Sequence, residues 1–223
     1  MNEFLFLGTA VLCLGMTLLA FKVWGKTGLY AWIAIATIIA NIEVVKCVDM
    51  FGMAVTLGNV MYGSLFLCTD IISELYGGKE ARKVVAMGFF SLVVFTIVTQ
   101  LGLLYLPNAQ DWASGYMKEL FGFVPRICLA SVTGYVVSNT LDTYLYDWIG
   151  KHTTRKWIRN NGSTMTSQIF DSVLFSVIAF AGVFSWGTIL ELILTTYAIK
   201  VMFALIDTPF LYLACRIEKS RKK

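Results

Sequence analysis

The sequence has little charge for its length, and this scarcity excludes most classes of soluble protein. Charged residues make up 14% of the 223 residues and hydrophobic residues 57%, whereas an average soluble domain is about 25% charged. A soluble chain must keep a mostly polar surface, which this composition cannot supply. The composition, with a mean hydropathy of +0.71, excludes a soluble globular domain, a disordered chain and a basic nucleic-acid-binding protein.

The sequence also lacks the residues of common catalytic and metal sites. It has one histidine, His152, and no HExxH, Walker A or CxxCH motif. The five cysteines show no CxxC spacing and lie in apolar stretches, so we expect small buried side chains rather than disulfides or a zinc site. We therefore expect a protein that is not an enzyme, does not use ATP by itself and needs no metal or other cofactor.

Long apolar runs occupy most of the chain. A helix needs about 20 apolar residues to cross a bilayer, and seven segments approach this length. Only short loops connect them, so we expect one transmembrane domain over residues 1–223, an all-α polytopic helical bundle. The predicted spans are 4–21, 29–48, 58–76, 84–106, 127–148, 165–184 and 188–215.

The distribution of lysine and arginine predicts the orientation. Seven spans place the loops after spans 1, 3, 5 and 7 on one side, and these loops hold 14 of the 18 basic residues. The other side holds only Lys118 and Arg126, while Lys46 and Lys200 lie within predicted spans. Basic loops stay in the cytoplasm. We therefore expect an N-terminus outside the cell, a C-terminus in the cytoplasm, and a place in the cytoplasmic membrane.

The connection between spans 4 and 5 is the one long external loop, from Pro107 to Pro125. Trp112, Tyr116 and Leu120 recur in it at helical spacing. This pattern predicts a short helix lying in the membrane interface. It would serve either as part of an aromatic belt or as a lid over an external entrance.

Several ionisable side chains lie inside the predicted spans, where each costs about 2.5–3.5 kcal/mol at mid-span. In span 2, Glu43, Lys46 and Asp49 follow Asn41 at spacings that make them neighbours on a helix. Such groups either pair internally and fix the helix packing, or face a wet cavity.

Four other spans also carry polar residues at helical spacing. These are Asp70 and Glu74 in span 3; Ser131, Tyr135, Ser138, Asn139 and Asp142 in span 5; Thr164, Gln168 and Asp171 in span 6; and Tyr197, Lys200 and Asp207 in span 7, where Pro209 interrupts the ladder of backbone hydrogen bonds. Polar stripes on so many helices predict a central polar cavity. Acids outnumber bases among them, so the cavity favours a small molecule rich in hydrogen-bond donors or positive charge.

The segment from Phe66 to Val84, FLCTDIISELYGGKEARKV, resembles the signature of the queuosine precursor transporter family, also called the vitamin uptake transporter family. Three further segments resemble the family in the same order: 126–142, 163–171 and 197–201. The resemblance covers about residues 29–215. Family members mostly have six spans, so the first span resembles an addition to a six-helix core.

The resemblance implies import of a 7-deazaguanine, such as 7-cyano-7-deazaguanine (preQ0), 7-aminomethyl-7-deazaguanine (preQ1) or queuine. A guanine edge offers N1–H and an exocyclic amine to a carboxylate, its carbonyl accepts a hydrogen bond, and its ring stacks on tyrosine. The expected substrate-binding residues are Asn41, Asp70, Glu74, Arg126, Tyr135, Ser138, Asn139, Asp142, Gln168, Asp171, Tyr197 and Lys200.

Among these, we expect Asp142 with Asp171 or Glu74 to hold the donor edge of the base. Gln168, Asn139, Arg126 or Lys200 would meet the carbonyl, and Tyr135 or Tyr197 would stack on the ring. Outside this set, Arg82 is expected to pair with Asp70 or Glu74 at the cytoplasmic end.

Two other functions compete with autonomous import. One is the substrate-binding S component of an energy-coupling-factor (ECF) transporter, with Ala36 and Ala40 as a docking surface for the coupling module. The other is an intramembrane enzyme or scaffold. The expected partners are a nucleobase-like small molecule and the lipid bilayer, with no nucleic acid, and a homodimer is the default assembly. The energy source, whether protons, facilitated diffusion or an external ATPase, is open.

Overall fold

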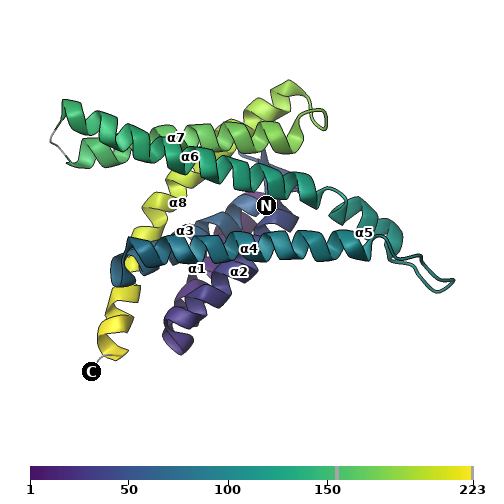
Figure 1. The fold of residues 1–223 in the computed structure, drawn as a ribbon, viewed down its shortest axis with the longest axis horizontal. Helices are drawn as coiled ribbons and strands as arrows, with labels where there is room; N and C mark the ends of the chain where they lie inside the picture. Colours follow the sequence, from purple (N-terminus) through teal and green to yellow (C-terminus); the bar gives the residue numbers. More distant parts are fainter. Residues whose placement is uncertain (154–155, 222–223) are drawn as a thin grey trace. The chain divides into compact units, whose positions relative to one another are not determined.

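The structure, a computed structural model, describes residues 1–153 and 156–221, with the backbone alone for residues 156–161. The chain forms two compact units (Figure 1). Unit 1 comprises Met1–Val124 together with the chain from Ala198 onward, and unit 2 comprises Pro125–Tyr197.

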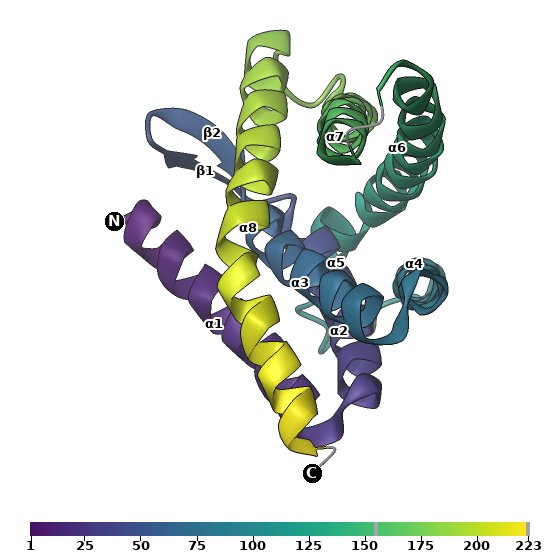
Figure 2. The ribbon, with the colours of Figure 1, turned by 90° about the vertical axis from the view of Figure 1, so that its left-hand side faces the viewer.

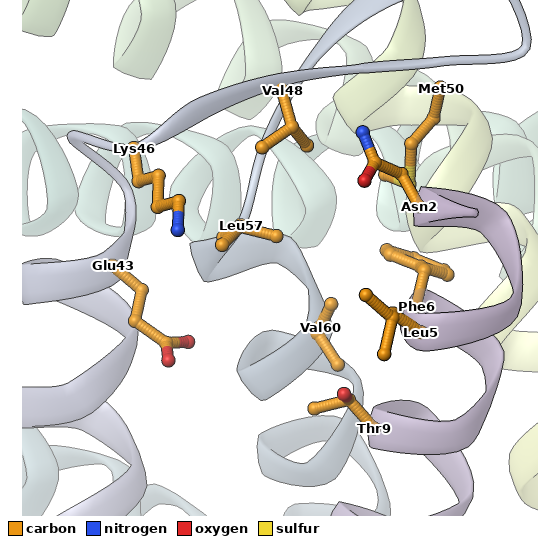
Figure 3. A pocket seen from close by; sticks show the side chains of 10 residues that line it. All are labelled: Asn2, Leu5, Phe6, Thr9, Glu43, Lys46, Val48, Met50, Leu57 and Val60. Carbon is orange, nitrogen blue, oxygen red and sulfur yellow. The ribbon is translucent and has the colours of Figure 1, made fainter.

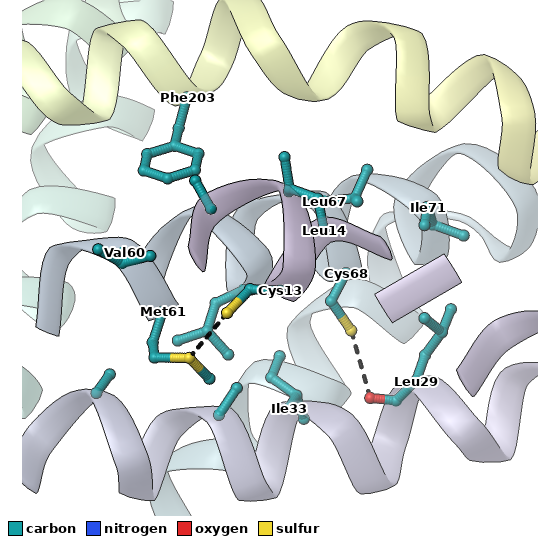
Figure 4. Packing of buried hydrophobic residues seen from close by; sticks show 14 of the residues in the cluster. Cys13, Leu14, Leu29, Ile33, Val60, Met61, Leu67, Cys68, Ile71 and Phe203 are labelled. Atoms are coloured by element: carbon teal, nitrogen blue, oxygen red, sulfur yellow. Dashed lines mark hydrogen bonds between the residues drawn. The ribbon is translucent and has the colours of Figure 1, made fainter. Parts of the chain in front are cut away.

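Unit 1 is a helical bundle built around α3. Its helices are α1 (Asn2–Trp24), α2 (Lys26–Glu43), α3 (Gly58–Tyr76), α4 (Gly78–Gly102), α5 (Ser114–Phe121) and the second part of α8 (Trp186–Arg221). Helix α3 packs against α1, α2 and α4. Figure 4 shows how Phe203 of α8 and Leu14 of α1 meet the buried face of α3.

The helices of unit 1 approach closely where small residues meet. Gly58 begins α3 against the backbone of α2, and a Cβ there would collide with the Ala40 carbonyl oxygen. Ala36 and Ala40 are both fully buried in this contact region. The expected docking surface for a coupling module is therefore not available at these two residues, because unit 1 itself covers them.

A β-hairpin interrupts the helices of unit 1. Strands β1 (Cys47–Met50) and β2 (Met53–Thr56) pair antiparallel across a two-residue turn (Figure 2). Both turn residues have positive φ, 54° at Phe51 and 76° at Gly52, as a type I′ turn requires. The predicted second span was therefore wrong beyond Glu43. Lys46 and Asp49 lie outside the helix, because α2 ends at Glu43 and Val48, a β-branched residue, belongs to strand β1.

Five helical segments are long and apolar enough to cross a membrane: α1, α4, α6 with the α5 region before it, α7 from Gly162, and α8. Helices α2 and α3 have 18 and 19 residues and are not among these five. At 1.5 Å per residue they are about 27–28 Å long, close to the roughly 30 Å of a bilayer core. Neighbouring helices cover much of α3, so its surface need not be apolar in order to face lipid. The protein is a multi-pass helical membrane protein, and the count of seven spans stays a prediction.

Three of the four basic segments meet at one end of unit 1. Lys26 Nζ lies 3.0 Å from Glu80 Oε2, and the Tyr30 hydroxyl donates to Glu80 Oε1 over 2.6 Å. At the same end, Arg221 of α8 donates to the Phe21 carbonyl of α1 over 3.1 Å. This convergence agrees with placing these loops on one side of a membrane.

Unit 2 contains α6 (Val124–His152), α7 (Lys156–Phe180) and the first part of α8. Helices α6 and α7 run side by side in opposite directions in both views (Figures 1 and 2). Helix α8 is continuous through Pro209, as the predicted span 188–215 requires. Proline removes one backbone hydrogen bond, and the remaining hydrogen bonds keep the helix intact.

The structure also tests the predicted short helix in the long loop and the predicted burial of the cysteines. The short helix in the long loop is confirmed as α5, although Trp112 lies before it. Cys13, Cys68 and Cys128 are buried as expected, but Cys47 is exposed because its segment forms the hairpin. Cys13 Sγ donates to Met61 Sδ, and Cys68 Sγ to the Leu29 carbonyl, in the core of unit 1 (Figure 4).

Candidate functional site

The polar stripes predicted on α6 and α7 face each other in unit 2. We call this contact region the polar seam, formed by Ser131, Gly134, Ser138 and Asp142 of α6 with Ser167, Gln168 and Asp171 of α7. The α6 stripe covers eleven residue steps, about 16 Å along the helix. It is long enough to line a path through much of a bilayer's apolar core.

At the centre of the seam, Asp171 lies against Gly134. A Cβ built at position 134 would lie 2.9 Å from Asp171 Oδ1 and 3.6 Å from the Asp171 carbonyl oxygen. Glycine at this position therefore makes room for a carboxylate between two helices. The sequence analysis placed Asp171 in a polar stripe of span 6 but gave no role to Gly134.

Nearer the other end of the seam, Asp142 of α6 meets Ser167 of α7. The Ser167 hydroxyl lies 3.4 Å from Asp142 Oδ1 and also 2.9 Å from the Thr164 carbonyl oxygen of its own helix. The contact with Asp142 is long, so this carboxylate keeps capacity for a stronger donor.

Gln168 lies between these two acids along α7. Its side-chain oxygen Oε1 is buried and has no hydrogen-bond partner among the described residues. A buried acceptor without a donor is costly, by about 1–3 kcal/mol. Such an atom in a seam with two carboxylates indicates a place for a ligand that donates hydrogen bonds.

Buried serines complete the α7 side of the seam, and the sequence prediction missed them. Ser163, Ser167, Ser172 and Ser176 are all almost fully buried. Small hydroxyl residues let membrane helices approach closely and supply hydrogen bonds. Their spacings of four, five and four residues were the available signal, but single serines carry little weight beside charged residues.

Arg126 lies at the end of α7 rather than within the seam. Its Nε donates to the Ile178 carbonyl over 2.6 Å, and Nη2 donates to the Ala181 carbonyl. These carbonyls belong to the last turn of α7 and the residue after it, where a helix has unpaired acceptors. The contacts favour a role in fastening α6 to α7 over contact with a substrate.

The other predicted residues of unit 2 lie along α6 and α8. Ser138 is buried, Tyr135 and Tyr197 are half-buried, and Asn139 is exposed beside the seam. Ser138 donates to the Tyr135 carbonyl of its own helix over 3.3 Å.

Four predicted residues belong to unit 1. Asn41 is buried and donates to the Thr37 carbonyl over 2.7 Å. Asp70 and Glu74 are both exposed on α3, whereas a place in the predicted cavity would bury them, and Lys200 of α8 is half-buried. Arg82 is exposed. The described residues show no ion pair from Arg82 to either acid, and Glu80 pairs with Lys26 and Lys83 instead.

The chemistry of the seam is that of an acceptor site. Two carboxylates and an unpartnered amide oxygen lie within one turn or two of each other on facing helices. In the described part of the chain, no group of three or more His, Cys, Asp or Glu side chains is placed to hold a metal ion. The seam is suited to a neutral or cationic molecule with several N–H donors.

Comparison with known proteins gives the family of the chain. Residues 56–214 match the family described as "Putative vitamin uptake transporter". A protein of Bacillus subtilis (strain 168), named "Probable queuosine precursor transporter", is 43% identical over 202 residues, 89% of this chain and 88% of its own. The chain belongs to this transporter family.

A second relative agrees with this assignment. The "Queuosine precursor transporter" of Escherichia coli (strain K12) is 25% identical over 163 residues, 71% of this chain and 72% of its own. No solved structure matches the chain.

The matched region places the family's characteristic part on the molecule. Residues 56–214 begin at the end of β2 and include α3 to α7 and most of α8. Both stripes of the polar seam therefore lie within it. Helices α1 and α2 and strand β1 lie before it, although the alignment to the Bacillus subtilis relative covers 89% of the chain. The family is one of transporters, and the protein is not an enzyme.

Proposed function

We propose that the protein imports queuosine precursors, the 7-deazaguanines preQ0, preQ1 or queuine, across the cytoplasmic membrane. The observation that carries the proposal is the 43% identity, over most of both chains, to a relative named for queuosine precursor transport. The polar seam supports it, because its acceptors suit the donor edge of a guanine.

In this proposal, one of the two carboxylates, that of Asp142 or that of Asp171, receives the N1–H and exocyclic amine of the base. The buried Oε1 of Gln168 accepts a further N–H. A charged acceptor strengthens such a hydrogen bond about twofold over a neutral one. The aminomethyl cation of preQ1 would be held by whichever carboxylate the base edge leaves open. The substrate enters from outside the cell and leaves toward the basic, cytoplasmic side.

The test is reconstitution of the purified protein alone in liposomes. We expect saturable uptake of radiolabelled preQ1 that unlabelled preQ0 inhibits and unlabelled adenine does not. Running the assay with and without an inward proton gradient separates coupled transport from facilitated diffusion. Absence of uptake by the protein alone, restored by an ATPase module, would favour the S-component alternative.

Site variants connect the uptake to the seam. Asp142→Asn and Asp171→Asn should each reduce uptake at least tenfold, since each replaces a charged acceptor. Asp147→Asn is the matched control, because Asp147 lies on the same helix but is exposed. Normal uptake in both seam variants would show that the seam is not the substrate-binding site. The class of transported molecule would still be tested by the uptake assay.

A further inference from the structure

A pocket of about 270 Å³ lies at the hairpin end of unit 1, and none of its lining residues belongs to the polar seam (Figure 3). Side chains of α1, the end of α2, strand β1 and the start of α3 line it. Its walls are mostly apolar, with Phe6, Met50 and Val60 among them, and its charged members are Glu43 and Lys46. Sites for drug-sized ligands occupy about 300–1,000 Å³, so this volume suits a smaller molecule, such as one nucleobase.

The backbone holds the two charged residues firmly in place. Glu43 is the last residue of α2, and its carbonyl accepts the Lys46 N–H over 3.0 Å. The Lys46 carbonyl in turn accepts the Leu57 N–H over 3.0 Å, which joins the base of the hairpin to α3. The positions of both side chains therefore follow from a tight turn rather than from a flexible loop.

The two charges point into the same space without meeting each other. Figure 3 shows the Glu43 carboxylate and the Lys46 ammonium turned toward the interior of the pocket. The described residues include no ion pair and no side-chain hydrogen bond for either group. Glu43 is half-buried and Lys46 is exposed, so the cost of holding a charge beside the apolar wall falls mainly on the Glu43 carboxylate. A ligand with donors on one edge and an acceptor next to them would supply both partners.

We propose that this pocket is a separate recognition site for the deazaguanine base. Glu43 accepts the N1–H and exocyclic amine, Lys46 donates to the adjacent carbonyl oxygen, and the apolar walls pack on the ring. This inference rests on the proposed function for the identity of the ligand. It assigns binding to Glu43 and Lys46, which were expected only as polar members of a span.

The proposal also gives α1 a task. Asn2, Leu5, Phe6 and Thr9 of α1 form one wall of the pocket. The start of α1 is fastened to the hairpin, because Asn2 Nδ2 donates to the Asp49 carbonyl over 2.9 Å and the Phe51 N–H donates to Glu3 Oε1 over 3.3 Å. The segment expected to be an addition to the core therefore completes a binding pocket.

The test reads occupancy of the pocket directly. Thr9→Cys, combined with Cys47→Ser, places a thiol on the pocket wall and removes the exposed one on the hairpin. We expect saturating preQ0 to slow maleimide labelling of position 9 about tenfold. Protection should persist when Asp142→Asn and Asp171→Asn disable the seam, and it should be lost with Glu43→Gln or Lys46→Met. Asp49→Asn and Lys118→Met are matched controls that keep the protection.

An analogue series checks the chemistry in the same preparation. 7-Deazahypoxanthine lacks the exocyclic amine, so it should protect the wild-type pocket at least tenfold less well than 7-deazaguanine. Glu43→Gln should reduce that difference. Thr9→Trp, which fills the pocket and keeps both charges, should reduce preQ0 uptake even if a charge variant folds poorly.

The outcomes separate the two proposals. If wild-type protein takes up no deazaguanine, the proposed function fails and this inference fails with it. If uptake is normal but preQ0 gives no protection at position 9, or if Glu43→Gln and Lys46→Met transport like wild type, the pocket assignment is overturned and the function stands.

Discussion

The carboxylate of Asp171 occupies the space that a side chain at Gly134 would take. A Cβ at position 134 would lie 2.9 Å from Oδ1, too close for any real contact between these atoms. Because position 134 has no side chain, the helix interface has space for the Asp171 carboxylate and holds this acid at a fixed depth in the membrane. Such an acid is expensive and therefore points to function.

Gly134→Ala should reduce both stability and uptake. The added methyl must displace Asp171 or separate the helices, and overpacking of this kind costs about 1–3 kcal/mol. Thermal unfolding in detergent and preQ1 uptake in liposomes measure the two effects. Gly15→Ala is the matched control: Gly15 is helical, has no neighbour within 4 Å, and should gain slightly from the better helix former. An unchanged melting temperature for Gly134→Ala would contradict the close contact.

Gln168→Leu should stabilise the unliganded protein and abolish uptake. The variant removes a buried oxygen without a partner, which costs about 1–3 kcal/mol in the wild type, and it also removes an acceptor from the proposed site. Gln100→Leu is the opposite control, because Gln100 Nε2 donates to the Phe121 carbonyl over 2.7 Å and its loss should destabilise. A destabilised Gln168→Leu that still transports would indicate a purely structural glutamine.

The sequence predicted the helical faces of unit 2 well. Helical spacing alone grouped Asp142 with the polar stripe of α6, and Gln168 and Asp171 with the polar stripe of α7. It could not supply the contacts between them. Gly134 bears no polar signal, and the engagement of Arg126 with Ile178 depends on where α7 ends in space.

The sequence predicted the end of span 2 poorly. The hydropathy of the chain up to Val48 is that of a membrane span. Only the turn at Phe51 and Gly52 indicates a hairpin. Phe51 is an unusual residue for positive φ, so the turn lacks the Asn-Gly signal that predicts a hairpin. The hairpin forms part of the pocket at Glu43 and Lys46, so helical periodicity in the sequence could not predict this pocket.

The Asp111 carboxylate accepts hydrogen bonds at the start of α5, and these should stabilise the helix equally from neutral pH down to about pH 5. A hydrogen bond from the Ser114 hydroxyl, and others from the Ser114 and Ala113 N–H groups, lower the pKa of Asp111. An acid with a lowered folded pKa stabilises fully above its unfolded value, about 3.9, and loses this contribution as the pH falls through the folded value. Amide hydrogen exchange of residues 114–121, corrected for intrinsic rates, should thus match at pH 7.5 and pH 5.

Substitutions test the same hydrogen bonds. Asp111→Ala should speed exchange in α5 at both pH values, while Asp111→Asn, which retains one acceptor oxygen, should have a smaller effect. Faster exchange of the wild type at pH 5 than at pH 7.5 would contradict the assignment to this carboxylate.

Cys47 should react with a membrane-impermeant maleimide from outside intact cells. It is exposed at the start of β1, and the predicted orientation puts the hairpin outside, opposite the basic end where Lys26 and Arg221 lie. Cys13, Cys68 and Cys128 are buried and should stay unlabelled until the protein is denatured. Cys47→Ser is the control that should remove the signal. A thiol introduced by Ser220→Cys, beside the basic tail, should react only after permeabilisation. Labelling of Cys47 only in permeabilised cells would reverse the orientation, and with it the direction in which the pocket at Glu43 receives its ligand.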